Sequence, residues 1–179
     1  MFARFALALI AALGLMAAPS RAQSQGDDPR LAWIAAHNSL RAQFGAAPLA
    51  WDERLATEAQ QWATQLAREN SLRHSSRKER RSTGENLWMG TRGAYSAQAM
   101  IASFAAEQRH FVPGAFPHVS RTGNWGDVGH YTQIVWPSTR KLGCALASNR
   151  EFDVLVCRYW PAGNVWGEVI AAPRELARR

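Results

Sequence analysis

The sequence predicts one domain of the α+β class, because helical and strand patterns occupy separate parts of the chain. Apolar side chains recur at helical spacing in three segments between residues 29 and 110. Three runs nearer the C-terminus, 130–136, 142–148 and 152–160, have the character of strands. The length of 179 residues suits a single domain with a sizeable core.

The N-terminus has the pattern of a secretory signal peptide. Arg4 supplies the positive region, residues 5–18 are apolar, and Ala22 ends a cleavage site with small residues. An uncleaved membrane anchor is the alternative, but the apolar run is shorter than the roughly 20 residues that a membrane span needs. We therefore expect residues 1–22 to be removed, leaving 23–179 as one exported domain with no transmembrane segment.

The net charge of the chain indicates which kind of surface the protein can contact, but it does not identify a ligand. The formal net charge is +7, and two of the arginines lie in the predicted signal peptide. This moderate basicity fits anionic surfaces such as lipid headgroups or acidic cell-wall polymers, and it equally fits a merely solubilising charge. It is too diffuse to indicate nucleic acid. The basic run Arg77-Lys78-Glu79-Arg80-Arg81 is expected to be a solvated loop rather than a binding patch.

The first expected helix covers residues 29–44. Asp28 followed by Pro29 is an N-cap and first-turn signal, and Gly45 follows the last apolar position of the helix. His37 lies on the apolar face, so we expect a core histidine whose ring is hydrogen-bonded rather than a ligand.

Two more helices are expected, at about 52–69 and 96–110, each beginning at a capping side chain. Between them, the segment 84–88 is too short to assign by period. The third helix carries Glu107 within its apolar stripe. Burying an unpaired carboxylate is costly, so Glu107 should have a partner or line a wet cavity.

A long loop, 112–128, leads to His130 at the head of the first expected strand. The last two strands are joined by a turn at 148–151. Cys144 and Cys157 are symmetric about that turn, so a hairpin would place them opposite each other, and an exported protein allows their oxidation. The spacing therefore predicts one disulfide.

Motifs of common hydrolases and nucleotide-binding proteins are absent: there is no HExxH, no GxSxG and no glycine-rich phosphate loop. A dispersed set is left, formed by His74, Glu85, Glu107 and His130. Two imidazoles can bind a divalent metal with carboxylates beside it, and the same set can perform general acid–base work. No pair has helical spacing, so four unrelated polar residues, with Glu107 in a salt bridge, are the alternative.

The other histidines and the tryptophans are expected to have simpler roles. His110 and His118 flank or occupy the long loop and should be exposed. Trp88 and Trp125 adjoin the candidate set and could line a groove for an apolar or sugar ligand, although core packing explains each of them as well. The tryptophans expected to pack are Trp33, Trp51, Trp62, Trp136 and Trp160.

Four segments, taken in order, resemble the CAP superfamily, also called the SCP domain, which groups cysteine-rich secretory proteins, antigen 5 and plant pathogenesis-related proteins. Residues 129–136 (GHYTQIVW) resemble its first signature, and 154–164 (VLVCRYWPAGN) its second. Residues 84–88 (GENLW) resemble its glutamate motif, and 37–41 (HNSLR) its first helix. The resemblance covers about residues 30–168.

This resemblance implies an α-β-α sandwich with a three-stranded antiparallel sheet between helical layers. It also implies a cleft holding His74, Glu85, Glu107 and His130, in which the two histidines can ligate a divalent cation such as zinc. The chain departs from the family at Phe104, where a tryptophan is common. It also lacks the family's cysteine-rich extension, so activities tied to that extension are not expected.

The family shares no single reaction, so two functions stay open. The first is a secreted binding module for a lipid or sterol, a glycan or a peptide. The alternative is a metal-dependent hydrolase, a protease or esterase in which Glu85 or Glu107 activates water, although catalytic zinc usually has three protein ligands. We favour binding over catalysis. A bacterial monomer or weak dimer in the periplasm or the medium is expected.

Overall fold

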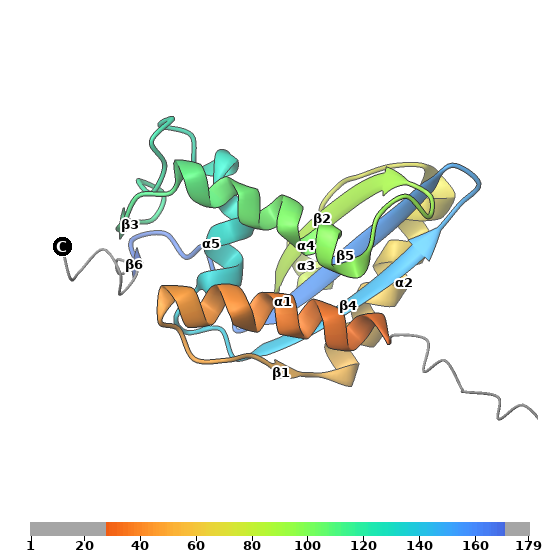
Figure 1. The fold of residues 1–179 in the computed structure, drawn as a ribbon, viewed down its shortest axis with the longest axis horizontal. Coiled ribbons are helices and arrows are strands. Elements are labelled where there is room, and N and C mark those ends of the chain that lie inside the picture. The colour runs from red at the N-terminus through yellow and green to blue at the C-terminus, as the bar shows by residue number, and fades with distance from the viewer. Residues whose placement is uncertain (1–27, 171–179) are drawn as a thin grey trace, which may run out of the picture.

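The computed structural model describes residues 28–170, in which a four-stranded sheet lies between two helical layers (Figure 1). One face of the sheet is covered by α1 (Pro29–Phe44), α4 (Ala97–Ala105) and α5 (Gly129–Val135). The other face is covered by α2 (Glu53–Glu69). The predicted α+β class and α-β-α sandwich are confirmed. The expected signal peptide lies outside the described residues.

The sheet has the strand order β1-β4-β5-β2. Its three long strands are antiparallel, as the resemblance implied, and a two-residue strand adds a parallel edge beside β4. A separate small pair joins the long loop to the C-terminal segment. The strands are β1 (Ala50–Trp51), β2 (Gly84–Thr91), β3 (Gly114–Ala115), β4 (Lys141–Ser148), β5 (Phe152–Trp160) and β6 (Val169–Ile170).

The prediction of a strand at 130–136 is wrong, because residues 129–135 form the helix α5. The third long strand is instead β2, the segment that was too short to assign. Most of α5 is buried on every side, so its sequence shows no polar face, and its β-branched residues Thr132, Ile134 and Val135 favour a strand by propensity. Contacts from distant parts of the chain to both ends of α5 therefore favour the helix over a strand.

The expected helix ends are confirmed for α1 and α2. The Asp28 side chain accepts from the backbone N–H of Arg30, and Gly45 ends α1 in the left-handed region at φ 87°. The third helix is shorter than expected, since α4 stops at Ala105 and a 3-10 helix, η1 (Ala106–His110), continues it. Within residues 28–170, no helix is both long enough and apolar enough to cross a membrane.

The predicted hairpin and disulfide are confirmed. Cys144 on β4 and Cys157 on β5 are directly opposite in the register, and their sulfur atoms are bonded. β4 ends at Ser148 and β5 starts at Phe152, so the turn occupies 149–151. The bond closes a loop between residues 13 positions apart, which corresponds to about 3 kcal/mol of stabilisation in the chain-entropy model.

His37 is a core histidine, as expected. It donates from Nδ1 to the Trp33 carbonyl at 2.7 Å and accepts at Nε2 from the Tyr159 hydroxyl at 2.8 Å. Burial lowers the pKa of His37 to about 4, although the bond to Trp33 opposes the shift. The ring is therefore neutral at physiological pH. Trp160 was expected to pack, but it is 43% exposed, because it ends β5 at the margin of the sheet.

Candidate functional site

The first half of the candidate site is a pair formed by Glu85 on β2 and His74 in the preceding loop. His74 Nδ1 donates to Glu85 Oε1 at 2.7 Å, and the backbone N–H of Ser75 donates to the same oxygen at 3.0 Å. The Ser75 hydroxyl donates to Oε2 at 2.8 Å. Because a carboxylate only accepts, the proton lies on Nδ1 and Nε2 is left free. The His74 side chain is 53% exposed, so that nitrogen is accessible.

Glu85 is fully buried and ionised. Burial by itself would raise the pKa of its carboxyl, but the bonds from His74 and Ser75 and the charge of Arg158 hold that pKa below its usual value. Arg158 Nη2 lies 3.1 Å from Glu85 Oε2, across the antiparallel pair β2–β5. The two oxygens of Glu85 are thus fully engaged in holding their neighbours.

Glu85→Gln is expected to lower the free energy of unfolding by about 2 kcal/mol at neutral pH, since hydrogen bonds to a charged group are lost. The folded pKa of Glu85 lies below 4.5, so the carboxylate stabilises the fold above that pH. This contribution disappears as the pH falls through the folded pKa. The difference between variant and parent should therefore shrink on acidification.

Urea unfolding at several pH values measures this difference. Glu151→Gln, in the exposed β4–β5 turn, is the matched control and should cost less than about 0.5 kcal/mol throughout. A cost of Glu85→Gln that stays constant from neutral pH to about pH 3 would contradict the assignment.

The second half of the site is a pair formed by Glu107 on η1 and His130 on α5. His130 Nδ1 donates to Glu107 Oε1 at 2.5 Å. Glu107 Oε2 accepts from the backbone N–H groups of His130 and Tyr131, at 2.9 and 3.0 Å, and so caps the N-terminus of α5. The His130 ring stacks on Phe104 with centroids 4.7 Å apart. Again Nδ1 is occupied and Nε2 is free.

Asn86 connects the two pairs. It follows Glu85 in β2, and its side chain points to the opposite face of the sheet. Its Nδ2 donates to the His130 carbonyl at 3.1 Å and to the Tyr159 hydroxyl at 3.0 Å. The chain of bonds continues to His37. α1, β5, β2 and α5 are thereby fixed relative to one another behind the two histidines.

A cavity of about 540 Å³ lies beside the first pair and is lined by His74 and Glu85. One wall is aromatic, formed by Phe116, Trp125 and Trp166. Two cations and a polar residue of α5 also line the cavity. These further lining residues are Arg77, Arg80 and Gln133. The cavity therefore offers an apolar surface next to positive charge.

The expected residues are distributed unevenly over this cavity. His74, Glu85 and Trp125 line it, whereas His130 and Glu107 lie on the adjoining helices and are not among its lining residues. Trp88 does not line it either and packs edge-to-face on Tyr95. His118 is exposed as expected, whereas His110 is only half-exposed.

The basic run is not the expected loop. Arg77–Arg80 form one helical turn, α3, closed by a capping box between Ser76 and Glu79. Arg77 and Arg80 face the cavity of His74, while Lys78 and Arg81 line a second cavity on the other side of the turn.

Two imidazoles with free Nε2 atoms, each held at Nδ1 by a carboxylate, fit the usual environment of metal-binding histidines. The carboxylates themselves are poor candidates for a water-activating base, because each of them already accepts three hydrogen bonds and Glu85 also pairs with Arg158. Among the described residues, one group of three potential ligands lies close enough to hold an ion: His37, Cys144 and Cys157. Its sulfur atoms are joined in the disulfide, so it is not a thiolate site.

Several residues that shape the site were missed from the sequence. Ser75 and Asn86 adjoin the glutamate motif, and nothing in their spacing indicates a role. Arg158 carries the clearest signal, because it follows Val154 and Val156 on the same face of an apolar strand. A cation at such a position requires a buried partner, and Glu85 is that partner.

Comparison with known proteins agrees with this architecture. The family model described as "Cysteine-rich secretory protein family" (CAP) matches residues 34–159, which is most of the described chain. The protein therefore belongs to the CAP family.

Its relatives include pathogenesis-related proteins of plants. It is 37% identical over 150 residues to pathogenesis-related protein 1A of Nicotiana tabacum, covering 83% of this chain and 82% of that protein. It is 33% identical over 168 residues to pathogenesis-related protein 1 of Arabidopsis thaliana, covering 93% and 95%. Among solved structures, NaASP2 with Zn²⁺ matches with a TM-score of 0.64 and 27% identity over 82% of this chain and 86% of that one.

Proposed function

We propose that this CAP domain is a secreted binding protein that holds a divalent cation through Nε2 of His74 and His130. The observation that carries the proposal is the pairing of each histidine with a carboxylate at Nδ1, at 2.7 and 2.5 Å. Such pairing fixes the ring, raises its basicity and leaves Nε2 as the ligand atom. A bound cation would supply a positive charge that recruits an anionic or carbonyl group of a ligand.

The donor set suits zinc better than calcium or magnesium. Imidazole nitrogen is a preferred ligand of zinc, whereas the harder cations prefer oxygen. NaASP2, which is 27% identical to this chain over the aligned region, is described with Zn²⁺. Zinc is usually four-coordinate, so two protein ligands leave coordination positions for a ligand or water.

The ligand would occupy the cavity beside His74. Phe116, Trp125 and Trp166 provide an apolar wall, and Arg77 and Arg80 provide positive charge. This combination suits a molecule with an apolar face and an acidic group, whether lipid, glycan or peptide. The hydrolase alternative is weaker, because Glu85 is buried and its oxygens are occupied by donors, and because Glu107 caps a helix.

Zinc calorimetry on the untagged mature chain, residues 23–179, tests the proposal. We expect His74→Ala/His130→Ala to weaken zinc binding by more than about 100-fold, since both ligands are removed. His110→Ala/His118→Ala removes the same number of imidazoles from outside the site and is the matched control. It should bind zinc like the parent.

Equal zinc affinity in the parent and in His74→Ala/His130→Ala would show that the metal assignment is wrong. The same proteins are then assayed against a library of peptides and esters. Zinc-dependent turnover that disappears in the His74/His130 variant would replace the binding role with the hydrolase. Zinc binding without turnover supports the binding role.

A further inference from the structure

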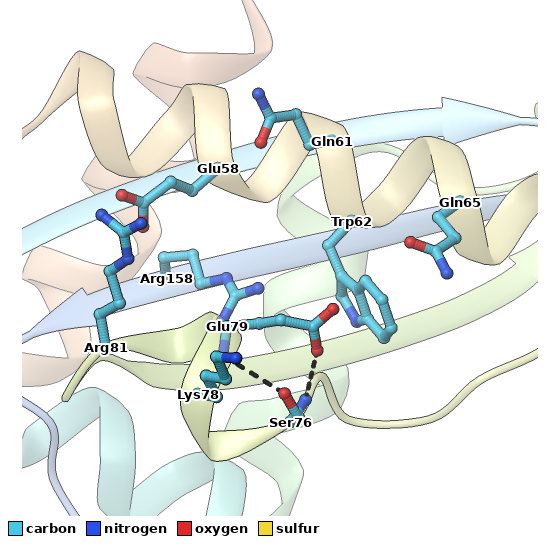
Figure 2. Close-up of a pocket in the computed structure, with 9 residues that line it drawn as sticks. All are labelled: Glu58, Gln61, Trp62, Gln65, Ser76, Lys78, Glu79, Arg81 and Arg158. Atoms are coloured by element: carbon cyan, nitrogen blue, oxygen red, sulfur yellow. Dashed lines mark hydrogen bonds between the residues drawn. The ribbon is translucent and has the colours of Figure 1, made fainter.

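A second and larger cavity, of about 970 Å³, lies on the α2 side of the sheet. Figure 2 shows it between α2, which contributes Glu58, Gln61, Trp62 and Gln65, and the turn of α3. Arg158 of β5 lies between these two walls, and its guanidinium points into the space that they enclose. Neither metal-site histidine lines this cavity.

The guanidinium of Arg158 is only partly satisfied. The residue is 3% exposed, and Nη2 pairs with Glu85 at 3.1 Å. Within residues 28–170, neither Nε nor Nη1 finds a hydrogen-bond acceptor. A guanidinium has five N–H groups, so three of them are buried without a protein partner at this position. Leaving such groups unpaired is costly, and an acceptor entering the cavity would remove that cost.

The acidic residues of the cavity already have partners. Glu58 forms an ion pair with Arg54 at 2.6 Å, outside the cavity lining. Glu79 accepts from the backbone N–H of Ser76 at 2.8 Å in the capping box. Lys78 and Arg81 add two positive charges to that of Arg158. The net charge of the lining side chains is therefore positive, which favours an anion.

The α2 wall offers groups for the rest of a ligand. Gln61 and Gln65 are exposed and line the cavity, and their amides can both donate and accept hydrogen bonds, with one N–H of Gln65 already donating to Glu69 at 2.9 Å. Such groups match hydroxyls, and the cavity has room for a sugar. We propose that this cavity is a second binding site, for an acidic sugar whose carboxylate or phosphate is held by Arg158. It requires no metal and is independent of the function proposed above.

Calorimetry on the metal-free mature chain, freed of cations by passage over a chelating resin, tests the second site. The probes are D-glucuronate, a glucose phosphate and neutral D-glucose, which separate a carboxylate from a phosphate and both from the sugar ring. At least one acidic sugar should bind, and glucose should not. Arg158→Lys keeps a charge opposite Glu85 but lacks the unpaired N–H groups, so the dissociation constant should rise about tenfold.

Arg81→Glu is a second variant, for the case that Arg158→Lys does not fold. Arg81 lines the cavity but is exposed, so its replacement should not prevent folding. It should also weaken binding about tenfold. Arg150→Glu makes the same charge change in the exposed β4–β5 turn and should alter the dissociation constant by less than about twofold. The proposal is overturned if neither acidic sugar binds the parent, or if Arg81→Glu and Arg150→Glu weaken binding equally.

Discussion

Replacing Arg41 with methionine is expected to lower the free energy of unfolding by about 4 kcal/mol. Arg41 lies near the end of α1 with no exposed surface, and its guanidinium donates four hydrogen bonds to backbone carbonyls. They belong to Ala47, Ile134, Trp136 and Thr139, at 2.6 to 3.0 Å. Methionine fills much of the volume but leaves these buried acceptors unpaired.

The same substitution should disturb the site, because Ile134 and Trp136 are at the end of α5, the helix that carries His130. Burial lowers the pKa of Arg41 to about 10, with the nearby Arg140 charge contributing, so the group is still charged at neutral pH. Urea unfolding measures the loss. Arg68→Met, on the exposed face of α2, is the control and should cost less than about 0.5 kcal/mol. A similarly small cost for Arg41→Met would refute the role given to these bonds.

Glu107→Gln is expected to reduce zinc affinity by about 10- to 100-fold, or up to about 2.7 kcal/mol, without removing either histidine. The carboxylate fixes the proton of His130 on Nδ1 and holds the ring in place. An amide holds both less firmly, because it is uncharged and only one of its two polar atoms accepts hydrogen bonds. The cap on α5 is weakened as well, since one oxygen accepts from two backbone N–H groups.

Zinc calorimetry and nitrogen NMR of the His130 imidazole separate a positioning role from a purely structural one. We expect weaker zinc binding together with a mixed tautomer in Glu107→Gln. Glu168→Gln, at an exposed position, should change neither quantity. Unchanged zinc affinity in a folded Glu107→Gln protein would mean that the carboxylate only caps the helix.

The sequence predicted the parts of the fold that depend on local signals. Asp28 and Gly45 mark the ends of α1 because a capping side chain and a left-handed residue act within one turn. Cys144 and Cys157 were paired correctly because a hairpin register is set by its turn. The segment 129–135 was predicted wrongly because its helix depends on distant partners, which a short window does not contain.

Polar bonds show how α5 is specified from a distance. Glu107 caps its start, and Asn164 donates to the Gly129 carbonyl and accepts from Thr132. Gln133 accepts from the backbone N–H of Gly163. These partners lie more than 20 residues away in the chain, in the second signature and on η1. Local propensity, which favours a strand here, is overridden by them.

The candidate site could be proposed from the sequence only through the family resemblance. His74 and Glu85 lie 11 positions apart in the sequence, with the short helix α3 between them. His130 and Glu107 lie 23 positions apart. No periodic pattern connects such residues. One physical clue was the carboxylate of Glu107 in the apolar stripe of its expected helix, and its partner is His130. Arg158 offered a similar clue, since a charge on an apolar strand face needs a counter-charge.

The most direct test of the metal proposal is anomalous diffraction at the zinc edge, on crystals of the mature chain grown with zinc. We predict one strong peak within bonding distance of Nε2 of both His74 and His130, with Glu85 and Glu107 still bonded to the Nδ1 atoms. A peak bound only by other side chains, or one that displaces a carboxylate from Nδ1, would contradict the proposed site.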